Sequence, residues 1–225
     1  MELEFRHELK HEISYADMLV IRQRLRCIAN VDEYAIDGKY KIRSLYFDNI
    51  YDKALEEKLN GISRREKFRI RYYNNDLSMI KLEKKCKAGG LGNKQAAVIT
   101  AEEARMLTEG DYEWMLKGDR PVAQELYVKM TTQGLKPKTI VDYIREPFVY
   151  APGNVRVTLD YDIRTGLDCV DFLNPECIMI PAKESPIILE VKWDEFLPDI
   201  IRDAVQLDCC RTGAFSKYAA CRMYG

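Results

Sequence analysis

Two short segments combine residue types and a spacing that suit phosphate chemistry. Residues 67–71 (KFRIR) and 189–192 (LEVK) alternate charged and apolar side chains with a period of two. In a β-strand this period puts the charged side chains on one face and the apolar ones on the other. Arginine offers a planar fork that bonds phosphate through two donors, and lysine offers a point charge. The segments therefore predict strands whose charged faces could bind a polyanion such as a phosphate chain.

The same alternation recurs in at least six segments, and it predicts which side chains share the charged face. An ordinary antiparallel sheet with one wet face explains any single strand. Repetition, and the excess of arginine and lysine, favour a sheet curled around a basic interior. The apolar partners, such as Phe68, Ile70, Leu189 and Val191, would then bury against helices. The charged face comprises Arg6, Glu8, Lys10, Lys67, Arg69, Arg71, Lys81, Glu83, Lys85, Tyr143, Arg145, Arg156, Thr158, Asp160, Glu190 and Lys192.

The few carboxylates on this face each have a basic neighbour on the same strand. Charge balancing is the simple explanation, although an exposed ion pair contributes little stability. The alternative is a hard divalent cation held by one or two carboxylates and by phosphate oxygens of a substrate. We predict Glu190 and Glu8 as the ligands of such a cation.

The elements that must position these residues are mixed strands and helices with hairpin-like spacing. Ser14–Asp17 and Thr100–Glu103 are capping boxes that predict helix starts, and residues 88–93 (AGGLGN) predict a flexible loop. We expect one antiparallel α+β domain over residues 1–225. The expected strands cover residues 2–13, 42–48, 65–73, 79–87, 95–99, 138–150, 155–164 and 186–193. The expected helices cover residues 14–29 and 49–59, a segment from 100, and residues 121–133, 196–207 and 214–223.

Composition narrows the class of protein. The chain has 225 residues, of which 47% are hydrophobic, so it can bury a core, and 35 basic residues balance 36 acidic ones. This balance gives no reason to expect a nucleic-acid partner. Seven cysteines without a Cys-x-x-Cys pair, and a start without an export signal, predict reduced thiols in the cytoplasm. No apolar run is long enough to insert into a membrane.

One sequence motif suggests a different function, that of a zinc peptidase. Residues 7–11 (HELKH) match the His-Glu-x-x-His pattern of zinc peptidases, which requires a helix and a third ligand. The alternation through this segment predicts a strand instead, and the chain has only these two histidines. We therefore interpret His7 and His11 as outer-face residues of a strand.

Six motifs in order resemble the VTC domain, the polyphosphate polymerase domain of the vacuolar transporter chaperone complex and a member of the triphosphate tunnel metalloenzymes. The resemblance covers essentially the whole chain. The motifs are residues 6–10 (RHELK), 44–49 (SLYFDN), 67–71 (KFRIR), 143–145 (YIR), 189–192 (LEVK) and 215–218 (FSKY).

This resemblance implies an eight-stranded antiparallel β tunnel with flanking helices, basic walls and Mn²⁺ or Mg²⁺ as cofactor. It implies Glu190 as a metal ligand, and Lys94 matches a further tunnel lysine. Where the wider superfamily begins with Glu-x-Glu-x-Lys, this chain has arginine at position 6, which fits the polymerase branch better than a two-metal triphosphatase. The residues matched to the family's tunnel lining are Lys10, Arg69, Arg71, Lys85, Tyr143, Arg145, Ser216 and Lys217.

We therefore predict a metal-dependent phosphotransferase that makes polyphosphate from ATP in a basic tunnel. A triphosphatase and a non-catalytic polyphosphate-binding module are the alternatives. Any export of the polymer would need another chain, such as a membrane partner. We expect catalytic roles for Lys10, Arg69, Arg71, Lys85, Arg145 and Lys217, and substrate-binding roles for Arg6, Lys81, Lys94, Tyr143, Arg156, Lys192 and Ser216.

Overall fold

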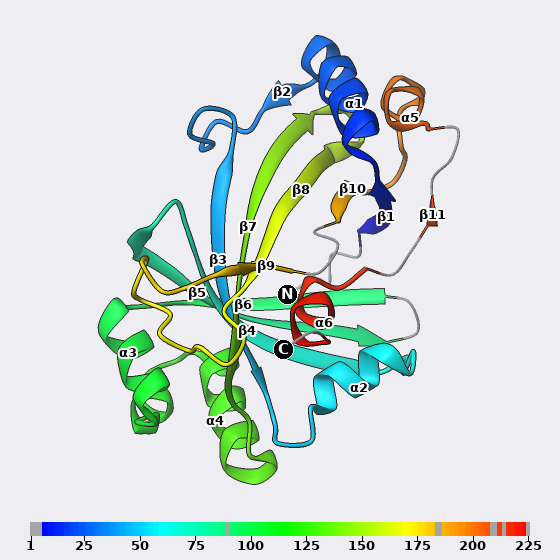
Figure 1. Cartoon of the computed structure of the whole chain (residues 1–225). Coiled ribbons are helices and arrows are strands. Elements are labelled where there is room, and N and C mark those ends of the chain that lie inside the picture. Colours follow the sequence, from blue (N-terminus) through cyan, green and yellow to red (C-terminus); the bar gives the residue numbers. More distant parts are fainter. Residues whose placement is uncertain (1–5, 89–90, 183–185, 208–210, 213–214, 224–225) are drawn as a thin grey trace. The chain divides into compact units, whose positions relative to one another are not determined.

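The computed structural model of the protein describes residues 6–88, 91–182, 186–207, 211–212 and 215–223. Across these ranges, eight strands have seven or more residues, and three further strands have two each (Figure 1). The strands are β1 (His7–Ile13), β2 (Asn30–Val31), β3 (Tyr40–Asp48), β4 (Arg65–Tyr73), β5 (Asp76–Ala88), β6 (Leu91–Ile99), β7 (Lys136–Tyr150), β8 (Val155–Thr165), β9 (Ile180–Pro181), β10 (Ile187–Trp193) and β11 (Arg211–Thr212). The helices are α1 (Tyr15–Ile28), α2 (Lys53–Leu59), α3 (Ala101–Glu109), α4 (Pro121–Gln133), α5 (Asp199–Val205) and α6 (Lys217–Arg222), with 3-10 turns η1 (Glu113–Leu116) and η2 (Pro152–Asn154).

Local signals place most of these elements where the sequence predicts them. Ser14 caps α1: its hydroxyl accepts a hydrogen bond from the Asp17 N–H, and the Asp17 carboxylate accepts one from the Ser14 N–H. Thr100 and Glu103 form the same capping box at the start of α3. Between β4 and β5, Asn74 and Asn75 both adopt positive φ, of 51° and 58°. Asparagine tolerates this region, which a tight hairpin turn requires.

The predicted loop over residues 88–93 is wrong for the part of it that the structure describes. Ala88 ends β5, and β6 begins at Leu91, with Gly92 opposite Lys87 in antiparallel register. Backbone pairing with β5 holds this segment extended, and pairing of that kind overrides the local preference of glycine for a loop. The predicted strand residues 2–5 lie outside the described ranges.

Three predicted helices begin later than expected. The side chains of Asp48 and Asn49 accept hydrogen bonds from the backbone N–H groups of residues 51, 53, 54 and 55, so α2 begins only at Lys53. Pro198 precedes α5, and α6 begins at Lys217. Proline restricts the residue before it to extended backbone, which explains the late start of α5.

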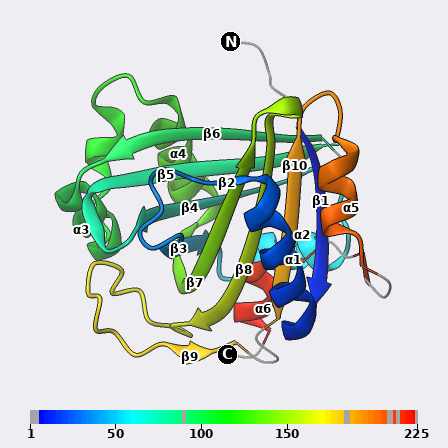
Figure 2. The same ribbon diagram turned by 90° about the horizontal axis from the view of Figure 1, so that it is seen from above.

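The described residues fall into two compact units. The first unit lies within Met1–Lys41, Tyr143–Ile163 and Glu184–Ser216. Its sheet has the order β11, β1, β10, β8, with antiparallel register through β1, β10 and β8. Helices α1 and α5 lie side by side along β1 and β10 (Figure 2). Their apolar residues, including Ile21, Leu25 and Ile201, form one core with Val157 and Val191 of the sheet.

The second unit lies within Ile42–Asp142, Arg164–Lys183 and Lys217–Gly225. Here the sheet order is β7, β3, β4, β5, β6. Only residues 136–142 of β7 belong to this unit, and its later residues, from Tyr143 on, belong to the first. Helices α3 and α4 cover β5 and β6 (Figures 1 and 2). Phe68, Ile70 and Leu82 bury under these helices with Leu107 and Leu126. In both units these apolar strand residues are therefore buried against helices, as the alternation predicts, whereas Leu9 of β1 is exposed.

Within the described ranges, no helix combines the length and the apolar character needed to cross a membrane. The prediction of one domain over residues 1–225 stays a prediction.

Candidate functional site

One face of the sheet in the second unit is strongly basic. Antiparallel register sets side chains of neighbouring strands opposite each other on the same face. Tyr46 stands opposite Arg69, which stands opposite Glu83, and Arg71 lies between Ser44 and Lys81. We use the name basic face for seven residues of this surface. They are the cations Lys67, Arg69, Arg71, Lys81, Lys85 and Lys94 and the carboxylate Glu83.

Three lysines lie in one row across the basic face. Lys67 of β4 stands opposite Lys85 of β5, which stands opposite Lys94 of β6. Like charges directly opposite each other destabilise a sheet. A polyanion bound along the row would relieve this repulsion, so the row is an arrangement suited to binding rather than to stability.

Glu83 organises part of the basic face. Its side chain is fully buried and accepts a hydrogen bond from Arg69 Nε at 2.7 Å. It also forms ion pairs with Arg69 Nη2 at 2.6 Å and with Lys94 Nζ at 2.5 Å. Burial alone would raise the pKa of Glu83, but Arg69, Arg71 and Lys94 outweigh it and hold that pKa well below its usual range. Glu83 is therefore an anchor that orients cations, and it is a poor proton acceptor.

Tyr46, which is not among the site residues predicted from the sequence, lies among these cations. Its ring is 2% exposed, and its hydroxyl accepts a bond from Arg69 Nη1 at 2.9 Å. Lys67 Nζ and Arg69 Cζ lie 5.6 and 5.7 Å from the ring centroid. In the sequence, the one sign that Tyr46 lies among these cations is its position on the charged face of a strand within the SLYFDN motif.

The sheet of the first unit carries a face of mixed charge. Lys10 Nζ lies 2.9 Å from Glu8 Oε1 and 3.0 Å from Glu190 Oε2. Lys192 also pairs with Glu190, and its Nζ lies 3.5 Å from Glu8 Oε1. Burial alone would lower the pKa of Lys10, but Glu190 and Glu8 outweigh it and raise that pKa above its usual range. Together with Arg145 and Asp160, these residues form the mixed face.

Arg145 is held on the mixed face by a buried carboxylate. Its Nε and Nη2 donate to the two oxygens of Asp160 at 2.6 and 2.7 Å, and its guanidinium lies 5.6 Å from the Tyr143 ring. Burial opposes the charged form, yet Asp160 and Tyr143 outweigh burial and raise the pKa of Arg145 further. Arg145 is thus a fixed cation with a defined orientation.

The mixed face brings together carboxylate oxygens of the kind that bind a divalent cation. Oxygens of Glu8 and Glu190, from two strands, already converge on one ammonium group. Thr158, opposite Glu190 on β8, has a buried hydroxyl without a hydrogen-bond partner among the described residues. No cluster of three or more His, Cys, Asp or Glu that could hold a metal occurs in those residues. Two carboxylates would therefore need phosphate oxygens to complete the shell, as is usual for Mg²⁺ with a phosphate substrate.

The remaining predicted site residues of the first unit are Arg6, Arg156 and Ser216. Arg6 precedes β1 and bonds Asp194 at 2.6 Å together with the Asn154 carbonyl group. Arg156 pairs with Asp32 at 3.2 Å, although its position on β8 is opposite Lys192. Ser216 directly precedes α6.

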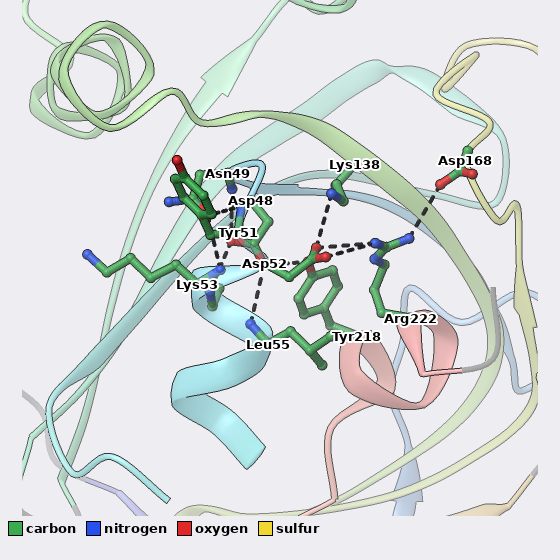
Figure 3. Close-up of polar contacts among 11 residues, drawn as sticks. Asp48, Asn49, Tyr51, Asp52, Lys53, Leu55, Lys138, Asp168, Tyr218 and Arg222 are labelled. Carbon is green, nitrogen blue, oxygen red and sulfur yellow. Dashed lines mark hydrogen bonds and ion pairs between the residues drawn. The ribbon is translucent and has the colours of Figure 1, made fainter. Parts of the chain in front are cut away.

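Lys217 is positioned by a network that the sequence analysis does not predict. Tyr218, the next residue of α6, donates to Asp48 Oδ2 at 2.6 Å and stacks on Tyr46 with centroids 5.1 Å apart. Asp48 also accepts from the backbone at the start of α2, and Arg222 and Lys138 both pair with Asp52 (Figure 3). The network ties α6, and hence Lys217, to β3 and α2.

The zinc-peptidase motif does not form. His7 and His11 lie on β1, a strand, and the His7 ring stacks on Trp193 with centroids 5.2 Å apart. This confirms the interpretation of these histidines as strand residues.

Comparison with solved structures identifies the class of fold. The chain matches a suspected adenylate cyclase from Bacillus halodurans with a TM-score of 0.53 and 14% identity, covering 85% of this chain and 82% of that one. Two proteins from Pyrococcus horikoshii OT3 match with TM-scores of 0.43, at 16% and 13% identity, covering 89% and 91% of this chain and 84% and 85% of theirs. No curated protein sequence matches the chain closely enough to indicate a relationship.

The VTC domain family model matches residues 5–224, so the chain belongs to the VTC domain family. This match and the shared fold confirm the predicted antiparallel α+β fold of the triphosphate tunnel type. Family membership also supports a phosphoryl-transfer function on triphosphate-type substrates and suggests a divalent metal.

Proposed function

We propose that this protein makes inorganic polyphosphate from ATP by metal-dependent phosphoryl transfer. The observation that carries the proposal is the basic face, where six cations and the carboxylate Glu83 share one sheet surface. Phosphoryl transfer depends mainly on positioning and on neutralising charge at the transferred group. A set of oriented guanidinium and ammonium groups supplies both.

The residues divide into two tasks. Arg69, Arg71, Lys81, Lys85 and Lys94 bind phosphate oxygens and stabilise charge on the transferred group. On the mixed face, Lys10, Arg145 and Lys192 contribute further cations, and Tyr143 supports Arg145. Glu190 and Glu8 would hold Mn²⁺ or Mg²⁺, which when bound neutralises charge on phosphate oxygens. Lys217 and Ser216, with Arg6 and Arg156, are proposed as additional phosphate contacts.

The state of Glu83 favours transfer over hydrolysis. A phosphate chain end is already anionic and needs no base, whereas hydrolysis needs a group that accepts a proton from water. Glu83, the carboxylate of the basic face, is not such a group, because it pairs with Arg69 and Lys94 and these cations help to hold its pKa low. A triphosphatase would therefore lack this base.

We also place the reaction in the cytoplasm, with ATP as the donor and without nucleic acid. Export of the polymer would require a partner in the membrane.

Incubation of the purified protein with ATP and Mn²⁺, followed by a polyphosphate-stained gel, tests the proposal. Wild type should make long polymer, Glu190→Gln should make none, and Glu12→Gln, an exposed carboxylate on the same strand as Glu8, should behave as wild type. Free phosphate without polymer would instead indicate a triphosphatase. Tight tripolyphosphate binding without turnover would indicate a binding module.

A further inference from the structure

The hydroxyl of Tyr46 has an unusual hydrogen-bond balance. A phenol carries one proton to donate, and a buried donor without an acceptor is costly. Among the described residues, the hydrogen bond from Arg69 Nη1 is the one that this oxygen makes, and there it acts as acceptor. No described residue accepts the proton of this hydroxyl, even though Tyr46 is almost fully buried, with 2% of its surface exposed.

The charged groups around Tyr46 explain why no acceptor is at hand. Lys67, Arg69 and Arg71 of β4 are all cations. Glu83 of β5 lies beyond Arg69 and is already bonded to Arg69 and Lys94. On β3 and α6, Asp48 is occupied by the hydroxyl of Tyr218, the ring that stacks on Tyr46. The surroundings therefore favour a negative charge at the Tyr46 oxygen.

The titration of Tyr46 agrees with this geometry. Burial alone would raise the pKa of the phenol, but Arg69, Lys67 and Arg71 outweigh burial and lower the pKa to about 7. Near neutral pH the free protein therefore holds a mixture of phenol and phenolate at this position.

We infer that Tyr46 is a further phosphate-contacting residue, whose oxygen takes up a proton from solvent when an anion binds and then donates it to a phosphate oxygen. The inference rests on the proposed function, because it requires phosphate on the basic face. A bound phosphate chain cancels the positive field of Lys67, Arg69 and Arg71, which restores the neutral phenol. It also supplies the acceptor that the hydroxyl lacks.

The test uses the full chain with tripolyphosphate and EDTA, at a pH just above the pKa of Tyr46. Calorimetry measures binding, and the near-ultraviolet absorbance of phenolate reports the tyrosine. Binding should decrease the phenolate absorbance in wild type and in Tyr73→Phe, a matched change at a neighbouring tyrosine that contacts Arg71. Tyr46→Phe should bind about 10-fold more weakly near neutral pH, consistent with the loss of one bond to a charged group, and should show no decrease.

The pH dependence gives a second readout. Proton uptake should weaken tripolyphosphate binding by wild type, relative to Tyr46→Phe, by up to about tenfold per pH unit above the Tyr46 pKa. The comparison cancels the ionisation of tripolyphosphate itself, which both proteins share.

Two results would overturn the inference. If wild type binds tripolyphosphate without any change in phenolate absorbance, Tyr46 takes up no proton, and the proposed function stands without it. If wild type binds no tripolyphosphate, with EDTA or with Mn²⁺, both the inference and the proposed function fail.

Discussion

The basic face and the mixed face carry similar residue types but balance charge in opposite ways. On the mixed face, Glu8, Glu190 and Asp160 pair with Lys10, Lys192 and Arg145, so each cation has a carboxylate partner. On the basic face, Glu83 is the single carboxylate among six cations.

This difference indicates a division of work. Paired carboxylates cost little to keep ionised and offer hard oxygens, which suits a divalent cation. An excess of oriented cations repels itself, and a bound anion would offset that repulsion, so the basic face suits an anion. The contrast predicts that changes on the two faces affect different ligands.

The largest expected effect comes from the basic face. Arg69→Gln should lower the polymerase rate by about 10²–10³-fold, the scale for losing one preorganised electrostatic contact. It should also destabilise the fold by about 3–5 kcal/mol, because Glu83 loses a partner of its buried ion pair. The rate is measured by polymer formation, and the free energy of unfolding is measured by urea denaturation.

The double variant Arg69→Gln/Glu83→Gln separates these two effects. Without a buried carboxylate to neutralise, it should recover most of the lost stability but none of the rate. A double variant within about threefold of the wild-type rate would contradict the role of Arg69 in phosphate binding.

The next effect comes from the mixed face. Glu190→Gln should weaken Mn²⁺ binding by at least about tenfold, since loss of even an outer contact of a metal site costs that much. Titration calorimetry in the presence of tripolyphosphate measures it. The Arg69→Gln/Glu83→Gln variant should bind Mn²⁺ as wild type does. Equal loss in both variants would show that the two faces do not divide the work as argued.

The charge excess of the basic face should also appear in stability against pH. The folded-state pKa of Tyr46, about 7, lies below its ordinary value of 10.0. A lowered pKa stabilises the fold when the group is ionised, so this contribution is fully present above pH 10 and is lost as pH falls through 7. Wild type should therefore gain stability relative to Tyr46→Phe between these pH values, by about 1 kcal/mol per pH unit at most. Urea unfolding of both proteins measures this difference, and parallel curves would argue against an excess positive field at Tyr46.

The smallest effect concerns the support of Lys217. Tyr218→Phe removes the bond to Asp48, but Asp48 keeps its backbone donors, so the loss should be about 1–2 kcal/mol. Thermal unfolding measures it. If the bond also positions Lys217, the polymerase rate of Tyr218→Phe should fall at saturating ATP while the folded protein still binds tripolyphosphate. An unchanged rate would limit the bond to a structural role.

Sequence reasoning predicted the strands and their faces because alternation is a local property. A charged residue at every second position of residues 67–71 already determines that Arg69 and Arg71 point the same way. The capping boxes at Ser14 and Thr100 are equally local, since each joins residues three positions apart.

It failed where hydrogen bonds to another segment of the chain decide the structure. The segment around Gly92 was predicted as a loop and is a strand, because β5 supplies its hydrogen bonds. Asp48 and Tyr218 are 170 positions apart, and no periodicity links them. The family motifs at residues 44–49 and 215–218 include these two residues, but they assign them no contact.

The sequence by itself determined which side chains are charged, which strand positions share a face, and that arginine and lysine dominate that face. Only the tertiary structure decided the partners: that Lys67, Lys85 and Lys94 form a row, that Glu83 is occupied, and that Tyr46 lies among three cations. The physical reason is that register between strands, unlike alternation within one, depends on packing across the whole sheet.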